Sequence, residues 1–324
     1  MIVKVKNLCY TNLTLYIVRF RPPLSRGEFM WEKKDIQFES DGLICRGWLF
    51  KQSQQEKAPC IILAHGFGGV KEMGLEAYAV RFADAGYHAL VFDYRHFGSS
   101  DGEPRQILDI KKQHQDYHAA ILYARSLPEV NPEKIILWGT SFSGGHVLQV
   151  AVEDTRIAAV ISQVPHLSGQ SSAKAAGFIQ NVRLGLASVR DHIHRLFNLS
   201  PFYVATMGRP GDLAAMTAPG EYEASRKLIS SDQDQLNEMV AARIFLSLGL
   251  YSPGKLAPML KVPWLVQGAK KDITTPYNIA EKAANAAMKG ELILYDRGHF
   301  DVYVQPDFER TITDQLAFLK RHIG

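Results

Sequence analysis

The chain has 324 residues, of which 46% are hydrophobic, 22% charged and 10% aromatic. This length and composition fit one large globular domain or two smaller ones, and they exclude fibrous, disordered and small disulfide-rich proteins. The formal net charge is only +4, and the basic residues are scattered along the chain. We therefore expect neither a nucleic acid nor an anionic membrane surface as a partner.

The cysteines and the apolar segments indicate the cellular compartment of the protein. The three cysteines, Cys9, Cys45 and Cys60, are odd in number and have no CxxC or Cys/His metal spacing. This favours free thiols in a reducing compartment, so we predict a cytoplasmic protein. No apolar run approaches the roughly 20 residues of a membrane-spanning helix, and the short run 13–20 is interrupted by Arg19. We predict neither a signal peptide nor a membrane anchor.

Residues 1–32 do not fit the pattern of the rest of the chain, and we treat them as an N-terminal extension of unknown role. From residue 34 onward, two β-rich runs, 36–39 and 43–50, flank the dipeptide Asp41-Gly42. An Asp-Gly pair between such runs is a strong hairpin signal. The domain is therefore predicted to begin with two antiparallel strands.

After the hairpin, short apolar runs alternate with segments of helical spacing, which is typical of parallel strands joined by crossover helices. The predicted strands are 60–64, 88–92, 134–138, 157–161, 263–267 and 291–295. The predicted helices are 73–85, 107–126, 142–153, 276–288 and 306–321. Together with the hairpin, this order predicts an α/β fold with a mostly parallel eight-stranded sheet and flanking helices.

The connection between the strands at 157–161 and 263–267 is too long for one crossover. It spans roughly a hundred residues, a length that is uncommon unless the segment is functional. The segment is rich in helical pattern. We predict an inserted helical cap at 168–255, so that the sheet domain comprises 33–167 and 256–324.

One strand runs directly into a glycine- and serine-rich turn, Gly139-Thr-Ser141-Phe-Ser143-Gly-Gly, and a helix follows. A sharp strand-to-helix turn lifts the central serine above the sheet edge, where a base can reach its hydroxyl. Ser141 is therefore the candidate nucleophile. The usual G-x-S-x-G pattern ends in glycine, whereas here that position is Ser143. An ordinary glycine-rich turn is the alternative interpretation.

A second turn, His65-Gly-Phe67-Gly-Gly, closes the first parallel strand. Acyl transfer needs two fixed N–H donors beside the nucleophile, one from the residue that follows it and one from a nearby loop. We predict that the backbone N–H groups of Phe67 and Phe142 form this oxyanion hole. A phosphate-binding loop is disfavoured because the glycines fit neither G-x-G-x-x-G nor a P-loop. His65 is interpreted as a structural strand-end histidine.

A serine nucleophile needs an imidazole base, and the base needs a carboxylate to orient it. His299 follows the last predicted strand and Asp272 follows the strand before it, so both lie at the sheet edge where ligands bind. The order Ser141, Asp272, His299 is that of a nucleophile-elbow hydrolase. Asp296 and Asp301 flank His299 and are less favoured candidates for the acid.

Other histidines occur in two close pairs. His114 with His118 and His192 with His194 lack a third ligand and an HExxH glutamate. We therefore predict no metal site, and no cofactor is expected.

The loop that begins at Asp93 is polar and contains glycine. We interpret it as a structural support for the turn at the oxyanion hole, with Asp93 and Arg95 as an ion pair. A direct part in catalysis is the less favoured interpretation.

These motifs, in this order, resemble those of the α/β-hydrolase fold superfamily. The resemblance covers about 35–324 and rests on His65-Gly-Phe-Gly-Gly, Asp93-Tyr-Arg-His-Phe-Gly-Ser-Ser, Gly139-Thr-Ser-Phe-Ser-Gly-Gly, Asp272 and Gly298-His299-Phe. Within the superfamily, the elbow and the cap segment 207–220 are similar to the capped dienelactone-hydrolase-like and X-Pro-dipeptidyl-peptidase-like group. The fungal members of that group include polyketide transferases and thioesterases of secondary metabolism.

The resemblance implies a serine hydrolase that cleaves a carboxylic ester or thioester through an acyl-enzyme. One alternative is an acyltransferase or thioesterase that moves a polyketide or other acyl group from a carrier thioester to an alcohol or water. The other is a non-catalytic binding protein of the same fold. The expected partner is a small acyl substrate, free or carrier-bound, and a homodimer is left open.

Substrate choice is expected to depend on the cap. Its apolar residues are candidates either for an acyl pocket or for the cap's own core. They are Phe178, Ile179, Leu184, Leu186, Phe197, Phe202, Met207, Met216, Phe245 and Leu248.

Overall fold

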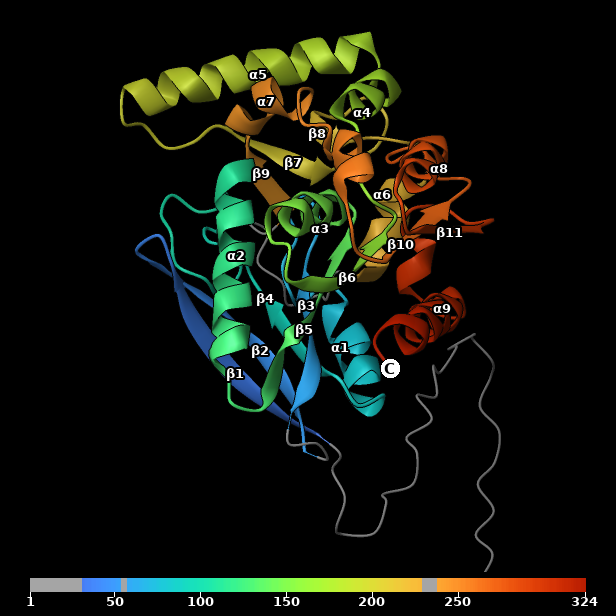
Figure 1. Cartoon of the computed structure of the whole chain (residues 1–324). Coiled ribbons are helices and arrows are strands. Elements are labelled where there is room, and N and C mark those ends of the chain that lie inside the picture. Colours follow the sequence, from blue (N-terminus) through green and yellow to red (C-terminus); the bar gives the residue numbers. More distant parts are fainter. Residues whose placement is uncertain (1–30, 54–56, 229–237) are drawn as a thin grey trace, which may run out of the picture.

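A sheet of eight strands forms the centre of the part of the chain that this computed structural model describes, residues 31–53, 57–228 and 238–324 (Figure 1). The strands are β1 (Trp31–Ser40), β2 (Leu43–Gln52), β3 (Ala58–Ala64), β4 (His88–Phe92), β5 (Val130–Thr140), β6 (Ile157–Gln163), β10 (Trp264–Ala269) and β11 (Gly290–Tyr295). Their order is β1-β2-β4-β3-β5-β6-β10-β11. The pairs β1–β2 and β2–β4 are antiparallel. All later pairs in this order, from β4–β3 to β10–β11, are parallel. The predicted α/β fold with a mostly parallel sheet is confirmed.

The hairpin of β1 and β2 forms because Asp41 and Gly42 both adopt positive φ angles, 51° and 78°. Two such residues make the tight turn whose twist matches that of the flanking strands. The predicted hairpin is therefore confirmed. β1 begins at Trp31, two residues before the predicted domain start, and the Trp31 indole N–H donates to Asp84 Oδ1 (2.9 Å) at this end of the strand.

Helices cover both faces of the sheet (Figure 1). One face packs against α2 (Ile110–Ser126), α3 (Phe142–Glu153) and α8 (Tyr277–Ala286), and the other packs against α1 (Leu75–Asp84) and α9 (Asp307–His322). A buried apolar cluster lies on each face. Strands between two helix layers bury side chains on both sides, which is why their sequences are continuous apolar runs. The five predicted helices correspond to these five elements.

The segment between β6 and β10 lies over the sheet edge that carries Ser141 (Figure 1). Its helices are α4 (Gly169–Ala176), α5 (Phe178–Leu196), α6 (Glu221–Ser225) and α7 (Phe245–Leu248), with 3₁₀ turns at Arg226–Leu228, Ala242–Ile244 and Pro253–Met259. It also contains a small sheet of β7 (Tyr203–Met207), β8 (Ala214–Met216) and β9 (Met239–Ala241), in the order β8-β7-β9. The helices were predicted and the small sheet was not, because strands of three to five residues are too short to show a period.

Part of the sequence lies outside the described residues. Residues 1–30, which make up most of the predicted N-terminal extension and include Cys9, are among them. Cys45 and Cys60 are buried free thiols. Across the described ranges, every helix is too short or too polar to cross a membrane.

Candidate active site

Ser141 lies at the turn between β5 and α3, in a backbone conformation that few residues with a side chain adopt. Its φ and ψ angles are 54° and −116°, which is the strained geometry of a nucleophile elbow. Hydrogen bonds hold both sides of the residue: Ser141 N–H donates to Gln163 O (2.8 Å), and His166 N–H donates to Ser141 O (2.7 Å). The turn therefore fixes the Ser141 hydroxyl at the sheet edge.

Ser143 occupies the position at which the G-x-S-x-G pattern has its last glycine. The turn is tight here, since a Cβ on Gly139 would lie 2.3 Å from Ser143 O. The Ser143 side chain fits because its hydroxyl points into the core, where it is hydrogen-bonded to Tyr94 Oη (2.6 Å) and Tyr117 Oη (3.1 Å). The departure from glycine is thus accommodated by two buried tyrosines.

The side chains of Ser141, His299 and Asp272 form one continuous hydrogen-bonded chain. His299 Nε2 lies 3.1 Å from Ser141 Oγ, and His299 Nδ1 lies 2.6 Å from Asp272 Oδ2. Because an ionised carboxylate can only accept, Nδ1 carries the proton and Nε2 is left to accept from the serine hydroxyl. All three residues are buried. The structure thus brings together the three residues that the sequence suggested as nucleophile, base and acid.

The loop after β10 holds the Asp272 carboxylate in place. Asp272 Oδ1 accepts from the Thr275 backbone N–H and Oδ2 accepts from the Thr275 hydroxyl, both at 2.7 Å. The alternative acids bond elsewhere. Asp296 is exposed and pairs with Lys271, while Asp301 accepts from a backbone N–H of its own turn (2.9 Å). The geometry favours Asp272 over both.

The turn after β3 passes directly beside Ser141. A Cβ on Gly66 would lie 2.9 Å from Ser141 Cβ, so this approach requires glycine. The rings of Phe67 and Phe142 pack edge to face, with 5.4 Å between their centroids. Phe142 is the first residue of α3, where N–H groups lack a partner within the helix. Among the described residues, no protein acceptor bonds the backbone N–H of Phe67 or of Phe142.

The loop after β4 supports this turn, but the predicted ion pair between Asp93 and Arg95 is wrong. Asp93 Oδ1 accepts from the Lys71 backbone N–H (2.7 Å), and Asp93 Oδ2 accepts from Lys71 Nζ (2.6 Å). Arg95 donates to Asp116 Oδ1 (2.7 Å) instead. Lys71 is 22 residues from Asp93, and Asp116 is 21 residues from Arg95. Local spacing in the sequence therefore could not reveal either pair.

The charges around His299 act on its imidazole in opposite directions. Burial by itself lowers the pKa of His299, but the carboxylates of Asp272 and Glu221 raise it, and the net pKa lies above the ordinary value. Glu221 is buried at the start of α6 and accepts a hydrogen bond from the Thr274 hydroxyl. Burial raises the pKa of Glu221, and His299 and Thr274 offset part of this rise. The inserted segment thus places a carboxyl group near the His299–Asp272 pair.

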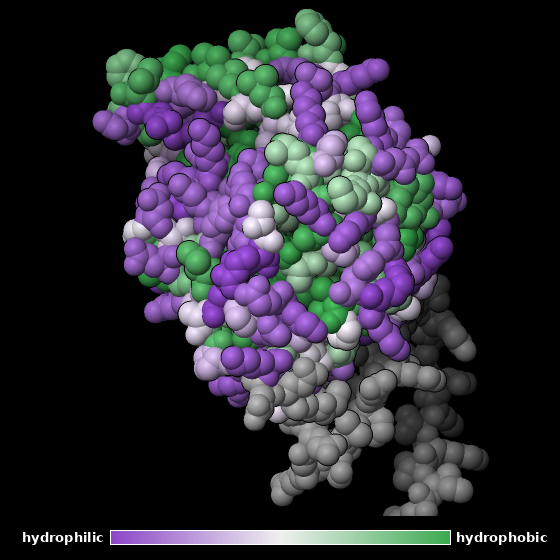
Figure 2. Space-filling view, in the orientation of Figure 1, coloured by the Kyte–Doolittle hydropathy of each residue, from purple (hydrophilic) through white to green (hydrophobic). Residues whose placement is uncertain are grey.

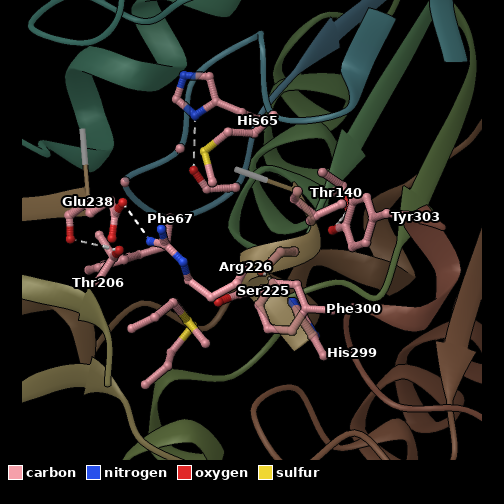
Figure 3. A pocket seen from close by; sticks show the side chains of 18 of the residues that line it. His65, Phe67, Thr140, Thr206, Ser225, Arg226, Glu238, His299, Phe300 and Tyr303 are labelled. Carbon is pink, nitrogen blue, oxygen red and sulfur yellow. Dashed lines mark hydrogen bonds and ion pairs between the residues drawn. The ribbon is translucent and has the colours of Figure 1, made fainter. Parts of the chain in front are cut away.

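Ser141 and His299 line a cavity between the sheet edge and the inserted segment (Figure 3). Arg226 and Glu238, which are also in its wall, form an ion pair (2.7 Å). The rest of the wall is largely apolar. Its apolar residues include Phe67, Met73, Leu75, Met207, Met216, Leu228, Phe300 and Tyr303.

A second, smaller cavity adjoins the first. The two share Phe67, Ser141 and Met216 in their walls. Besides Ser141, the polar residues in the wall of the smaller cavity are His166, Ser172, Thr274 and Thr275. Ser141 therefore faces two adjoining cavities, both with mainly apolar walls.

The apolar residues predicted as pocket candidates divide into three groups. Three of them line the cavities: Met207, Met216 and Leu248. Three others pack inside the inserted segment, as the alternative of a cap core expected: Leu184, Phe202 and Phe245. The remainder are exposed on or just after α5, and a pocket role is wrong for them: Phe178, Ile179, Leu186 and Phe197. A helical period shows that a face is apolar but not which way it points.

The histidines that were considered as a base or as metal ligands bond to other groups in the structure. His65 is buried with its ring edge-on to Tyr94, 4.9 Å between centroids. His114 Nε2 lies 3.0 Å from a ring nitrogen of His146, and burial lowers the pKa of His114 to about 4. In the ranges that the structure describes, no group of three His, Cys, Asp or Glu side chains is arranged to hold a metal ion.

Thr275 and Glu221 were not predicted as site residues from the sequence. Thr275 leaves a local signal, because an aspartate followed by a hydroxyl residue three positions later is a side-chain-to-backbone pattern. Glu221 leaves none, since it approaches His299 only through the folding of the inserted segment.

The fold, the elbow and the hydrogen-bonded chain at the sheet edge define a class of protein. Residues 59–306 match the family described as alpha/beta hydrolase fold. The chain belongs to this family, and it is an enzyme.

Proteins similar to this chain have names that describe different activities. The quorum-quenching protein AidA of Acinetobacter baumannii is 41% identical over 287 residues, which cover 89% of this chain and 94% of AidA. The polyketide transferase ATR5 of Stachybotrys chlorohalonatus is 30% identical over 296 residues, 89% of this chain and 97% of ATR5. Among solved structures, the alpha/beta hydrolase GrgF from Penicillium sp. sh18 superposes with a TM-score of 0.74 at 26% identity, covering 90% of this chain and 99% of GrgF.

Proposed function

We propose that the enzyme cleaves a carboxylic ester or thioester through an acyl-enzyme on Ser141. The observation that carries this proposal is the hydrogen-bonded chain from Ser141 through His299 to Asp272 at a strained elbow. A serine hydroxyl is a weak nucleophile unless a base takes its proton as it attacks. His299 Nε2 is placed for that transfer, and Asp272 holds the imidazole in the required tautomer.

In the first half-reaction, Ser141 Oγ bonds to the substrate carbonyl carbon while its proton moves to His299 Nε2. The Asp272 carboxylate stabilises the resulting imidazolium. The tetrahedral intermediate then collapses, the bond to the leaving alcohol or thiol breaks, and His299 returns the proton to the leaving group. In the second half-reaction, His299 takes a proton from water as the water oxygen bonds to the acyl carbon. The tetrahedral intermediate then collapses, the bond to Ser141 Oγ breaks, and His299 returns the proton to Ser141, which releases the acid and the free serine.

We propose that the backbone N–H groups of Phe67 and Phe142 bind the oxyanion of both tetrahedral intermediates. They flank Ser141, and neither has a protein acceptor within the described residues. Fixed donors aimed at a developing negative charge contribute about 3 to 4 kcal/mol each in hydrolases of this type.

The cavities indicate the substrate class. The larger cavity has mainly apolar walls, so it suits the hydrocarbon chain of an acyl group. The smaller cavity also opens beside Ser141, so it is placed to take the leaving group. A donor thioester carried on a protein is compatible with this arrangement if its acyl group reaches the larger cavity.

Acyl transfer to an alcohol is the second candidate. It is favoured by the similarity to the polyketide transferase ATR5 and by the smaller cavity, which places a second binding space next to Ser141. The chemistry differs only in the second half-reaction, in which an alcohol rather than water gives its proton to His299.

The similarity to AidA adds a biological role to the same chemistry. We propose that a quorum signal containing an ester bond is among the substrates, because cleaving that bond would inactivate the signal. Acyl lactones are cyclic carboxylic esters and therefore belong among the substrates to be tested. A cytoplasmic location is also proposed, since Cys45 and Cys60 are free thiols.

The proposal is tested by initial rates with acyl esters, acyl thioesters and acyl lactones of increasing chain length, with and without an added alcohol. We expect the value of kcat/KM to rise with chain length until the larger cavity is filled. Free acid as the product indicates hydrolysis, and an acceptor-dependent ester product indicates transfer. Absence of turnover with all three substrate types would contradict the proposal.

A further inference from the structure

The outer face of α5 is an exposed apolar stripe. We define the α5 seam as the six residues Ile179, Val182, Leu186, Val189, Ile193 and Leu196, whose spacing alternates between three and four. All six are exposed, and the exposed fraction is 67% for Leu186 and 79% for Leu196. Figure 2 shows this band as continuous hydrophobic surface along the top of the molecule. Phe178 and Phe197 flank the seam at its two ends, with Phe178 82% exposed.

The seam is not the face by which α5 packs on its own chain. The buried residues of α5 are Gln180, Leu184, Ala187, Ser188 and Asp191, which lie on the opposite side of the helix at 100° per residue. Asp191 on this inner face accepts from Arg243 and from the Phe202 backbone N–H. α5 is thus anchored from within, and its second apolar face is exposed among the described residues.

The size of the stripe is that of a protein interface. The seam and its two flanking phenylalanines expose on the order of 1,000 Å² of apolar surface, whereas the largest apolar patch on a typical monomer is about 300 to 600 Å² and a stable interface buries about 800 Å² per partner. A repeat of three and four residues is the pattern that packs against another helix.

The seam is also palindromic, which specifies the occupant. About a midpoint between Ala187 and Ser188, Leu186 is matched with Val189, Val182 with Ile193, Ile179 with Leu196 and Phe178 with Phe197. A two-fold axis through that midpoint pairs each apolar residue with one of similar size on an antiparallel second copy. We infer that a second copy of this chain packs its α5 against this seam, so that the enzyme is a dimer joined through its inserted segments.

The flanking charges disfavour an anionic lipid surface as the occupant. Arg183 Nη1 donates to Gly211 O (2.7 Å), and the Arg190 guanidinium lies over the Phe202 ring, 4.2 Å from its centroid. Both arginines therefore turn back onto their own chain. A membrane-binding helix instead directs such side chains toward lipid headgroups.

The first experiment measures the mass of the full-length protein by sedimentation velocity over a range of concentrations. We expect a dimer for the wild type, and we expect Leu186→Glu to raise the dimer dissociation constant at least roughly 100-fold, because two buried carboxylates meet at the axis. The matched control is Leu122→Glu on α2, where the leucine is 68% exposed and lies off the seam. This control is expected to remain dimeric, and both variants should stay folded, with the circular dichroism spectrum of the wild type.

A second experiment tests the antiparallel pairing by disulfide formation in a Cys9→Ala background. Leu186→Cys lies beside the axis and is expected to cross-link two copies, whereas Phe178→Cys alone should not. Mixing Phe178→Cys with Phe197→Cys should restore cross-linking. A monomeric wild type, a dimer that survives Leu186→Glu, or efficient cross-linking by Phe178→Cys alone would overturn the inference. Co-sedimentation of a monomer with anionic vesicles, lost in Leu186→Glu, would assign the seam to lipid instead.

Discussion

The sheet edge and the segment between β6 and β10 contribute to the site in different ways. The sheet edge supplies polar groups that are buried and held by several hydrogen bonds each, as Asp272 is by Thr275. The inserted segment supplies mainly apolar walls, such as Met207 and Met216, and the Glu221 carboxyl group that acts on His299. In the proposed mechanism, the fixed groups on the sheet carry out the chemistry, while the insertion selects the substrate and modulates the pKa of His299.

The difference extends to the surfaces that face away from the site. The outer side of the sheet domain is covered by helices that pack on the sheet, whereas the insertion presents the α5 seam to its surroundings. Substitutions in the two regions should therefore have distinct consequences, and the following experiments compare them in pairs.

The largest effect is expected for Ser141→Ala. Loss of the nucleophile should lower kcat by about 10⁴- to 10⁶-fold, leaving only what the oxyanion donors and binding contribute. The matched control is Ser143→Ala, two residues along the same elbow. It should lower the melting temperature, because Tyr94 and Tyr117 lose a partner, yet keep kcat within about tenfold. Equal losses in the two variants would contradict a special role for Ser141.

The second-largest effect is expected when the carboxylate that orients His299 is replaced. Asp272→Asn should lower kcat by about 10³- to 10⁴-fold, because an amide in this place favours the wrong tautomer of His299. Asp296→Asn is the control, since its carboxylate is exposed and pairs with Lys271. Steady-state rates on one ester suffice for the comparison. A larger loss in the Asp296 variant would assign the acid to the other side of His299.

A smaller and substrate-dependent effect is expected in the inserted segment. Met216→Trp should narrow the cavities on both sides of Ser141 and lower kcat/KM for long acyl chains by about 10- to 100-fold, while acetyl esters change little. Met259→Trp is the control, because Met259 is exposed and lies outside both cavities. A uniform loss across chain lengths would mean that Met216 does not select the acyl group.

The smallest effect is a displacement of the pH profile. Glu221 raises the pKa of His299, so Glu221→Gln should lower that pKa and move the acidic limb of kcat/KM to lower pH. The base is then neutral, and active, over a wider range on the acidic side. Glu223→Gln removes an exposed carboxylate that pairs with Arg209 and should leave the limb in place. A shift toward higher pH in the Glu221 variant would refute this electrostatic role.

The sequence allowed the sheet domain to be predicted because its signals are local. Strands buried on both faces are continuous apolar runs, and the Asp41-Gly42 turn and the elbow at Ser141 are short motifs with fixed geometry. The residues placed at the ends of these strands lie together because parallel strands end at one edge. The order of strands along the chain was therefore informative about the site as well.

Contacts that depend on tertiary structure could not be predicted from the sequence. The partners of Asp93 and Arg95 are Lys71 and Asp116, which no local spacing connects to them. The apolar residues on and just after α5 were indistinguishable from pocket residues, because a helical period does not give the direction of its face. Glu221 belongs to a five-residue helix whose position depends on the whole insertion.

The most direct test of the central claim is to locate a covalent intermediate. The wild-type enzyme is treated with a fluorophosphonate or with a slowly hydrolysed acyl ester, digested with protease, and the adduct is mapped by tandem mass spectrometry. We expect a single adduct on Ser141 that appears at the rate of inactivation and is absent from the Ser141→Ala variant. An adduct on any other residue with the same kinetics, or continued labelling of the variant, would contradict an acyl-enzyme on Ser141.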